Sequence, residues 1–249
     1  MAANTMDIRI VGLGGLPEVL PGDDLAGLIL AAAAGAQETI AHETVVIVAQ
    51  KIVSKAEGAI VDLRGIEPSE FALRWANQWG KDARFIELIL RQSRRIVRMD
   101  RGVLIAETHH GFVAANAGAD QSNVPGEGFA TVLPSDPDAS ARAVRNRLHC
   151  GAVLITDSFG RPWREGLVNI AIGVSGMEPL EDCRGTPDRD QHVLQATIVA
   201  RADELAAAGG LVMKKGDGVP VALIHGFQWP PAEGSSQPLI RRAEFDLFR

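Results

Sequence analysis

The fold class is decided by the stretch Arg94-Arg95-Ile96-Val97-Arg98-Met99-Asp100-Arg101-Gly102-Val103-Leu104-Ile105-Ala106. Apolar and β-branched residues on either side of the turn at 100–102 predict two strands, 94–97 and 103–106. Strands that are joined by so short a turn pair antiparallel. A sheet built around such a pair is not the all-parallel sheet of a doubly wound fold.

The rest of the chain adds strands and helices that do not alternate strictly. Residues 153–156 and 168–174 predict a second antiparallel pair. This order favours a mixed α+β fold with largely antiparallel sheets and flanking helices. No linker-like stretch interrupts the first 225 residues. We therefore expect a single domain over 1–249, which could be built from two interleaved subdomains. The other predicted strands are 7–11, 44–48 and 219–224, and the predicted helices are 25–32, 68–75, 85–90, 136–148 and 197–208.

Composition excludes several classes of protein. The chain has 249 residues, 46% of them hydrophobic, and a formal net charge of −6, which argues against a broad basic surface for nucleic acid. Two cysteines without a Cys/His cluster indicate neither a disulfide scaffold nor a structural zinc site. The apolar run 28–34 is far shorter than the ~20 residues of a membrane helix. No secretory signal is visible, so we expect a cytoplasmic protein without a membrane partner.

Two aspartates stand in similar settings. The apolar run 112–115 leads into Asn116-Ala117-Gly118-Ala119-Asp120-Gln121-Ser122-Asn123, and the run 152–155 leads into Thr156-Asp157-Ser158. We expect both aspartates at strand ends, where carboxylate, hydroxyl and amide oxygens suit Mg²⁺ or Mn²⁺. The alternative is Asx-turn chemistry, which places Asp and Asn in turns without any ligand. Spacing alone leaves both interpretations open.

A glycine turn, Gly12-Leu13-Gly14-Gly15-Leu16-Pro17, follows the first predicted strand. It lacks the third glycine of a dinucleotide fingerprint, because Pro17 stands at that position. A flexible turn is the favoured interpretation, although its backbone N–H groups could contact a nucleotide phosphate or base. No P-loop sequence occurs in the chain.

Other charged residues admit a structural and a functional interpretation. Lys51 and Lys55 follow a buried strand and could be merely solvated or could bind a phosphate. Neighbouring His109 and His110 would point to opposite sides of a strand, so joint metal ligation is not expected. A local cluster of arginines is more typical of solvated surface than of an anion site, and it consists of Arg91, Arg94, Arg95, Arg98 and Arg101.

Ordered motifs run through nearly the whole chain. They are 15–17 (Gly-Leu-Pro) with 22–25, 54–58 (Ser-Lys-Ala-Glu-Gly), 110–112, 116–123, 156–164, 202–206, 218–221 and 225–226. Together they resemble the coenzyme F420-0:L-glutamate ligases, the γ-glutamyl ligases of deazaflavin-cofactor biosynthesis. Several motifs in one order are far more specific than any one of them.

The resemblance implies a GTP-dependent amide ligase that adds L-glutamate to the deazaflavin precursor F420-0, and then further γ-linked glutamates, through an acyl phosphate. It also implies an uncommon α+β fold, an intertwined homodimer and a two-metal centre for Mg²⁺ or Mn²⁺, with K⁺ as a further ion. By motif, Asp120, Asp157 and Lys55 would be catalytic. Asp120 and Asp157 would hold the first metal, with Ser158 near the second.

The nucleotide contacts also follow from the resemblance. The residues assigned to GTP are Gly15, Leu16, Pro17, Gln50, Lys51, Lys55, Asn123, Met213, Lys215, Gly216 and Gly218. Two departures affect this set: Gln50-Lys51 stands where some members have Ser-Thr, and Met213-Lys214-Lys215 replaces a Met-Gly-x pattern. Two rival functions stay open, a non-catalytic nucleotide- or deazaflavin-binding homologue and a related amide ligase with another acid acceptor.

Overall fold

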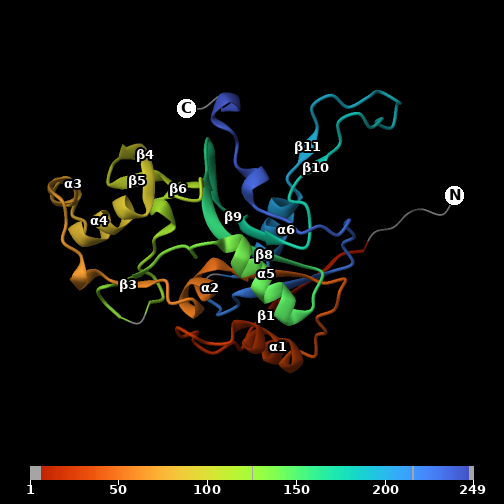
Figure 1. Cartoon of the computed structure of the whole chain (residues 1–249), viewed down its shortest axis with the longest axis horizontal. Helices are drawn as coiled ribbons and strands as arrows, with labels where there is room; N and C mark the ends of the chain where they lie inside the picture. The colour runs from red at the N-terminus through yellow and green to blue at the C-terminus, as the bar shows by residue number, and fades with distance from the viewer. Residues whose placement is uncertain (1–6, 125, 215, 247–249) are drawn as a thin grey trace.

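The structure, a computed structural model, describes residues 7–124, 126–214 and 216–246. Its centre is a five-stranded sheet (Figure 1), in which β2 and β8 run parallel and the other neighbours are antiparallel. In spatial order the strands are β1 (Arg9–Leu13), β12 (Val221–His225), β2 (Val45–Ala49), β8 (Ala152–Arg161) and β9 (Arg164–Ser175).

Helices cover both faces of this sheet, which explains why its central strands read as continuous apolar runs. Alternation along β2 sends Val46 and Val48 to one face and Val45 and Ile47 to the other. The first face packs against α1 (Leu25–Gly35), α2 (Gln50–Ala56) and α5 (Pro137–Leu148), and the second against α6 (Arg201–Gly210).

Local sequence fixes the ends of these helices. The Asp136 side chain accepts the Ala139 N–H at 2.9 Å, and Pro137 occupies the first turn of α5, where a missing N–H costs nothing. Asp138 accepts the Val174 N–H of β9 at 2.8 Å and also bonds residues near 236, so α5 is tied to the sheet and to the C-terminal segment.

A second hydrophobic core lies at one end of the elongated molecule, at the left of Figure 1. Trp75, Ile89 and Leu104 are among its buried side chains. It is formed by α3 (Glu70–Trp79), α4 (Ala83–Arg91) and a sheet of β4 (Ser93–Asp100), β5 (Val103–Thr108) and β6 (Val113–Ala115). The short pair β3 (Ile60–Asp62) and β7 (Phe129–Thr131) and the 3₁₀ turns η1 (Leu63–Gly65) and η2 (Asn116–Gly118) also contribute side chains to the second core and contact α2, α4 and β5.

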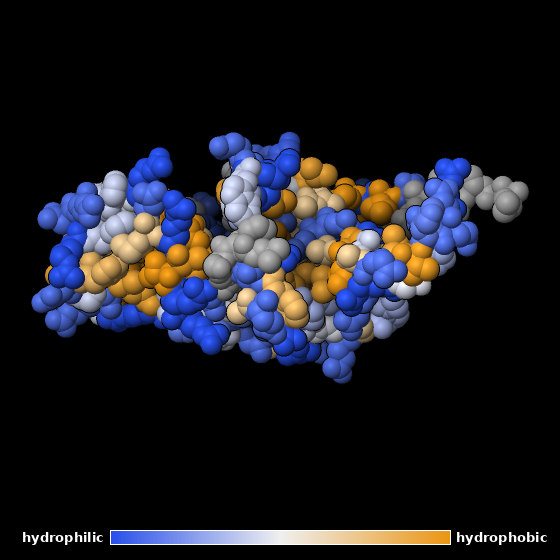
Figure 2. All heavy atoms as spheres, turned by 90° about the horizontal axis from the view of Figure 1, so that it is seen from above, coloured by the Kyte–Doolittle hydropathy of each residue, from blue (hydrophilic) through white to orange (hydrophobic). Residues whose placement is uncertain are grey.

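Two segments project from the body. The β8–β9 ribbon continues past the end of β2, and near its tip Trp163 and Leu167 are 78% and 61% exposed. The arm of residues 181–199 carries the pair β10 (Glu181–Asp182) and β11 (Ile198–Val199) (Figure 1). The turns η3 (Gln237–Leu239) and η4 (Ala243–Phe245) follow near the C-terminus. Figure 2 shows the upper face as a mixture of hydrophilic residues and several apolar areas.

The mixed α+β class and both predicted antiparallel pairs are confirmed. Three local expectations are wrong. Asp157 lies inside β8 and not at a strand's end, because the ribbon carries pairing on through Arg161. Residues 197–200 are not helical, since β11 occupies 198–199 and α6 begins at Arg201. His109 and His110 lie in a turn after β5 and not on a strand. In the part of the chain that is described, no helix is long and apolar enough to cross a membrane.

Candidate active site

Four chain segments meet at one edge of the central sheet. Leu13 pairs with Val221, so the turn after β1 and the segment before β12 emerge at the same edge. The Ala49 N–H donates to the Pro220 carbonyl at 2.8 Å, which places the end of β2 beside them. Ala49 also pairs with Thr156, so α2 begins at the level of Asp157. The sheet order therefore gathers residues 14–17, 50–55, 157–158, 213–214 and 216–220.

Helix α2 presents two lysines to this edge. Lys51 and Lys55 are four residues apart and hence one turn apart on the same side of the helix. The Ser54 hydroxyl contacts Gln50 Oε1 at 2.9 Å and donates to the Val132 carbonyl at 2.7 Å. This bond ties α2 to the residue that follows β7, next to Thr131, which bridges to Asp120.

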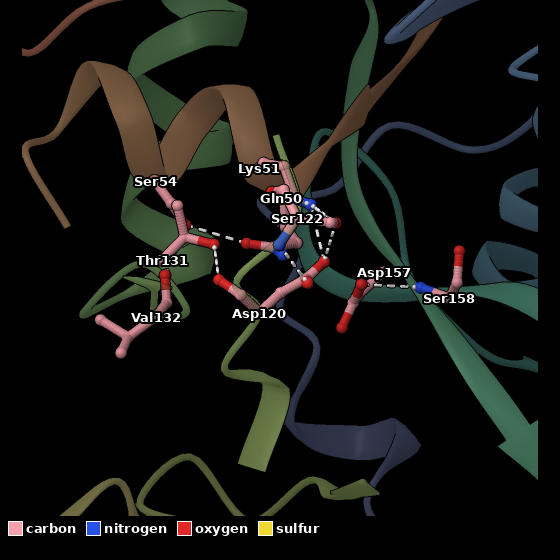
Figure 3. A network of polar contacts seen from close by, with 9 residues as sticks. All are labelled: Gln50, Lys51, Ser54, Asp120, Ser122, Thr131, Val132, Asp157 and Ser158. Atoms are coloured by element: carbon pink, nitrogen blue, oxygen red, sulfur yellow. Dashed lines mark hydrogen bonds and ion pairs between the residues drawn. The ribbon is translucent and has the colours of Figure 1, made fainter. Parts of the chain in front are cut away.

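Asp120 reaches the edge from the second core. After η2 the backbone of Asp120 forms a two-bond bridge with Thr131, at 3.0 and 2.8 Å. Its carboxylate then meets α2, where Lys51 Nζ lies 2.6 Å from Asp120 Oδ2 (Figure 3). Ser122 completes the group, because its N–H donates to Asp120 Oδ1 and its hydroxyl to Oδ2, both at 2.8 Å.

These contacts keep Asp120 charged. Burial raises the pKa of the Asp120 carboxyl, but hydrogen bonds from Lys51 and from the Ser122 amide and hydroxyl outweigh that effect and hold the pKa below its ordinary value. The Asx-turn contact with Ser122 is present, as the structural alternative requires. A turn alone does not explain why a lysine 69 residues away is brought to the same carboxylate.

The side chains of Asp157 and Ser158 lie on opposite faces of β8. Val153, Ile155 and Phe159 face the α2 side, and alternation puts Asp157 there too. Ser158 points the other way, as Figure 3 shows, and its hydroxyl donates to Asn169 Oδ1 at 3.0 Å. The structure therefore brings Asp157 to the edge that holds Lys51 and Asp120, and it turns Ser158 toward the α6 side.

Lys55 is buried, with only 5% of its side chain exposed, and it forms an ion pair with Glu18. Glu18 follows the Gly15-Leu16-Pro17 turn, so this pair joins the turn to α2. Gly15 has a φ of 76°, a value that glycine adopts without strain. A cavity of about 400 Å³ adjoins the turn, lined by Gly14, Gly15, Pro17, Leu28, Ala31, Ala32, Gly35 and Ala36.

The remaining predicted nucleotide residues lie at the rim of this edge. Met213 packs against the α6-side core, while Gly216 and Gly218 have positive φ values in the exposed stretch before β12. Asn123 is exposed one residue beyond Ser122. Lys215 lies outside the described residues.

The donor set at this edge suits a hard divalent ion that is shared with a substrate. Within the described ranges, no group of three or more His, Cys, Asp and Glu side chains could hold a metal by itself. Asp120 and Asp157 supply two carboxylates, with the Ser122 hydroxyl and a lysine beside them. Mg²⁺ is characteristically bound by one or two carboxylates together with substrate phosphates and water. The Lys51 ammonium, held by three oxygens, already marks a cation position.

Sequence reasoning missed several residues of this edge. Glu18 belongs to none of the motifs, although it directly follows the Gly15-Leu16-Pro17 turn, so its ion pair with Lys55 was not predicted. Ser122 is one of several potential oxygen ligands or hydrogen-bond partners in the sequence of this turn, but its double contact with the Asp120 carboxylate was not predicted. Asn169 lies in a predicted strand, and only the pairing of β8 with β9 brings it opposite Ser158.

Residues 15–226 match the model of the family described as F420-0:Gamma-glutamyl ligase. The chain is similar to the Coenzyme F420:L-glutamate ligase of Methanothermobacter thermautotrophicus, with 44% identity over 252 residues that cover 98% of this chain and 100% of that protein. The protein of the same name from Methanopyrus kandleri is also 44% identical, over 95% of this chain and 100% of its own length. The one from Haloarcula marismortui is 39% identical, over 97% and 96%.

Proposed function

The chain belongs to the F420-0:Gamma-glutamyl ligase family, and from this premise we propose that it is the ligase that joins L-glutamate to F420-0 at the expense of GTP. In the first step the terminal carboxylate of F420-0 attacks the γ-phosphorus of GTP, which gives an acyl phosphate and GDP. In the second, the glutamate amine attacks the acyl carbon, an amide forms, phosphate leaves and the amine loses its proton. Repetition on the γ-carboxylate of the added glutamate lengthens the product.

The observation that carries the proposal is the meeting of Asp120, Asp157, Lys51 and Lys55 at one sheet edge. Phosphoryl transfer needs little covalent help from a protein and depends on positioning and on positive charge around the transferred group. Two carboxylates with two lysines one helical turn apart provide both, since the carboxylates suit metal ions and the lysines suit phosphate oxygens.

Each residue at the edge has a proposed part. Asp120 and Asp157 would hold a Mg²⁺ or Mn²⁺ ion, and Ser158 with Asn169 would offer oxygens for a second ion on the opposite face of β8. The ion at Asp120 and Asp157 would neutralise charge on the phosphates, and K⁺ is a further ion in the proposal. Lys55, in its buried position, would place an ammonium on a phosphate oxygen.

The nucleotide would lie along the turn and the rim. Gly15, Leu16 and Pro17, with the adjoining cavity of about 400 Å³, would hold it on one side, a volume in the range of ligand pockets (~300–1,000 Å³). Gln50 and Lys51 would contact it at the start of α2. Asn123, Met213, Gly216 and Gly218 would approach from the other side, and Lys215 belongs to the same proposal.

A homodimer is the proposed assembly. Trp163 and Leu167 stand exposed near the tip of a two-stranded ribbon that extends beyond the sheet. Large apolar side chains in such a position are typical of protein–protein contacts. A second copy of the chain would cover the ribbon, which agrees with the intertwined assembly that the resemblance implies.

The test is direct. The purified protein is incubated with GTP, Mn²⁺ or Mg²⁺, L-glutamate and F420-0, and products are analysed by mass spectrometry, with GDP and phosphate measured in parallel. We expect F420-0 to gain one or more glutamyl residues with stoichiometric GDP. Replacing GTP by ATP tests nucleotide choice. A product with another acid acceptor alone would indicate the related amide ligase, and nucleotide binding without any product would indicate a binding protein.

A further inference from the structure

The Lys51 ammonium sits among three oxygen atoms. Its Nζ lies 2.6 Å from Asp120 Oδ2, 2.7 Å from the Ser122 hydroxyl and 2.9 Å from the Ser122 carbonyl. An ammonium has three N–H donors, and here all three have an acceptor. Figure 3 shows this cluster at the start of α2, with Asp157 drawn beside it.

We propose that Lys51 is a built-in cation that occupies the divalent-ion position at Asp120 and must leave it when the ion binds. This inference rests on the proposed function. It adds one step to that function, in which the Lys51 ammonium is exchanged for a metal ion at Asp120. Lys51 would then act as a positioning residue that couples arrival of the ion to capture of the nucleotide.

The geometry opposes a divalent ion at Asp120 Oδ2 while the ammonium is there. Oδ2 of Asp120 already accepts from both Lys51 and the Ser122 hydroxyl, and Oδ1 accepts from the Ser122 N–H. A divalent ion that approaches Oδ2 meets an ammonium at hydrogen-bond distance, and two cations so close repel strongly. The ion can therefore take the Oδ2 position only if the ammonium withdraws.

The Lys51 ammonium can move to an alternative position. Its side chain is partly exposed, at 20%, and rotation about the bonds of its flexible four-carbon stem can move the ammonium toward solvent. It lies one turn from Lys55 on α2, and the Lys55 partner Glu18 adjoins the glycine turn. A triphosphate along this turn would give both ammonium groups a better acceptor than the one that Lys51 loses.

The consequence is linkage between the two ligands. Without nucleotide, the ion must displace Lys51 and binds weakly. With nucleotide, the phosphate receives the ammonium, and the Asp120 oxygen becomes available. Ion and nucleotide should therefore each raise the affinity for the other, and Lys51 should carry that coupling.

The experiment measures binding, not turnover. Free Mn²⁺ is titrated into the nucleotide-free full-length chain and followed by its electron paramagnetic resonance signal. Three single variants are compared with the wild type: Lys51→Met, Lys51→Gln as a polar second choice should the first fold poorly, and Lys81→Met as a control. Lys81 is an exposed lysine of the second core's α3–α4 connection, far in sequence from the edge.

Lys51→Met and Lys51→Gln should bind Mn²⁺ at least about fivefold more tightly than the wild type, whereas Lys81→Met should not differ. Adding Asp120→Asn to Lys51→Met should abolish the gain, which assigns it to that carboxylate. In the presence of a non-hydrolysable GTP analogue the wild type should approach the affinity of the variants.

Unchanged or weaker Mn²⁺ binding in both Lys51 variants would overturn the inference, as would a gain that survives Asp120→Asn. These outcomes are separable from failure of the proposed function. If glutamylation of F420-0 occurs but the Mn²⁺ affinity does not change in the Lys51 variants, only the proposed exchange is wrong. If no glutamylation occurs but Mn²⁺ affinity responds as expected, the exchange stands and the reaction must be reassigned.

Discussion

Replacing Asp120 with asparagine removes one negative charge and keeps the shape of the side chain. The structure predicts a small effect on stability. Lys51 and Asp120 are 20% and 44% exposed, and ion pairs so open to water contribute about 0–1 kcal/mol. Asparagine can still accept the Ser122 N–H. We therefore expect the melting temperature to fall by no more than about 2–4 °C.

Activity should respond very differently. If Asp120 holds a metal ion at the phosphates, loss of its charge should lower the glutamylation rate by at least about 100- to 1,000-fold. Because the pKa of Asp120 is depressed in the folded protein, its contribution to stability is present at neutral pH and is lost as the pH falls through that pKa. The small stability gap between wild type and Asp120→Asn should thus close in acid.

Asp138 provides a matched carboxylate for comparison. It accepts bonds from the Val174 N–H and the Ser236 N–H and from two serine hydroxyls, and lies away from the sheet edge. Asp138→Asn should cost about 3 kcal/mol, or roughly 6–12 °C, while the activity of the folded fraction persists. Turnover of Asp120→Asn within about tenfold of the wild type, or a melting temperature below that of Asp138→Asn, would refute the metal-binding role of Asp120.

Three further outcomes follow from side chains at the surface and in the core. Burial raises the pKa of the Cys150 thiol to about 12. Ellman's reagent at pH 8 should therefore titrate only Cys183 in the native chain, and both thiols in guanidinium. Fast reaction of both thiols in the native chain would contradict the burial of Cys150. Glu18→Gln removes the carboxylate that competes with phosphate for Lys55. Calorimetry should therefore show GTP binding about three- to tenfold more tightly than in the wild type. Weaker binding would instead mean that Glu18 helps to hold Lys55 in position for GTP. If the proposed homodimer forms through the ribbon, Trp163→Ser should raise its dissociation constant at least about tenfold in sedimentation, and an unchanged value would place the interface elsewhere.

The elements with a strong local signal could be predicted from sequence. The pair at 94–106 was found because β-branched residues flank a glycine turn, and β4 and β5 occupy that region with the expected pairing. The run 44–48 was found because β2 is covered on both faces and is therefore apolar throughout. Errors concerned where these elements stop, since β8 continues through polar residues once β9 pairs with it.

Helix α2 was not predicted, for a physical reason. It has only seven residues and follows β2 without a side-chain cap, so neither a start signal nor a full hydrophobic period marks it. The lysines were therefore expected at a strand's end. Their spacing on one side of a helix became visible only with the structure.

The candidate site was predicted as a set of residues and not as an arrangement. Motifs pointed to Asp120, Asp157 and Lys55, but the contact between Lys51 and Asp120 depends on the order of strands in the sheet and on the Asp120–Thr131 bridge. No local pattern encodes either feature. The same holds for Ser158, whose direction follows from its place in β8 and not from the motif that contains it.

The last long strand of the chain, β12, lies between β1 and β2 and bonds to both. During synthesis on the ribosome β1 emerges first, yet its neighbour in the sheet is among the final segments to appear. The glycine turn after β1 can therefore reach its place beside α2 only after β12 has been made. A chain cut short before β12 would leave β1 without its only partner strand among the described residues, as an unpaired edge open to proteases and to aggregation.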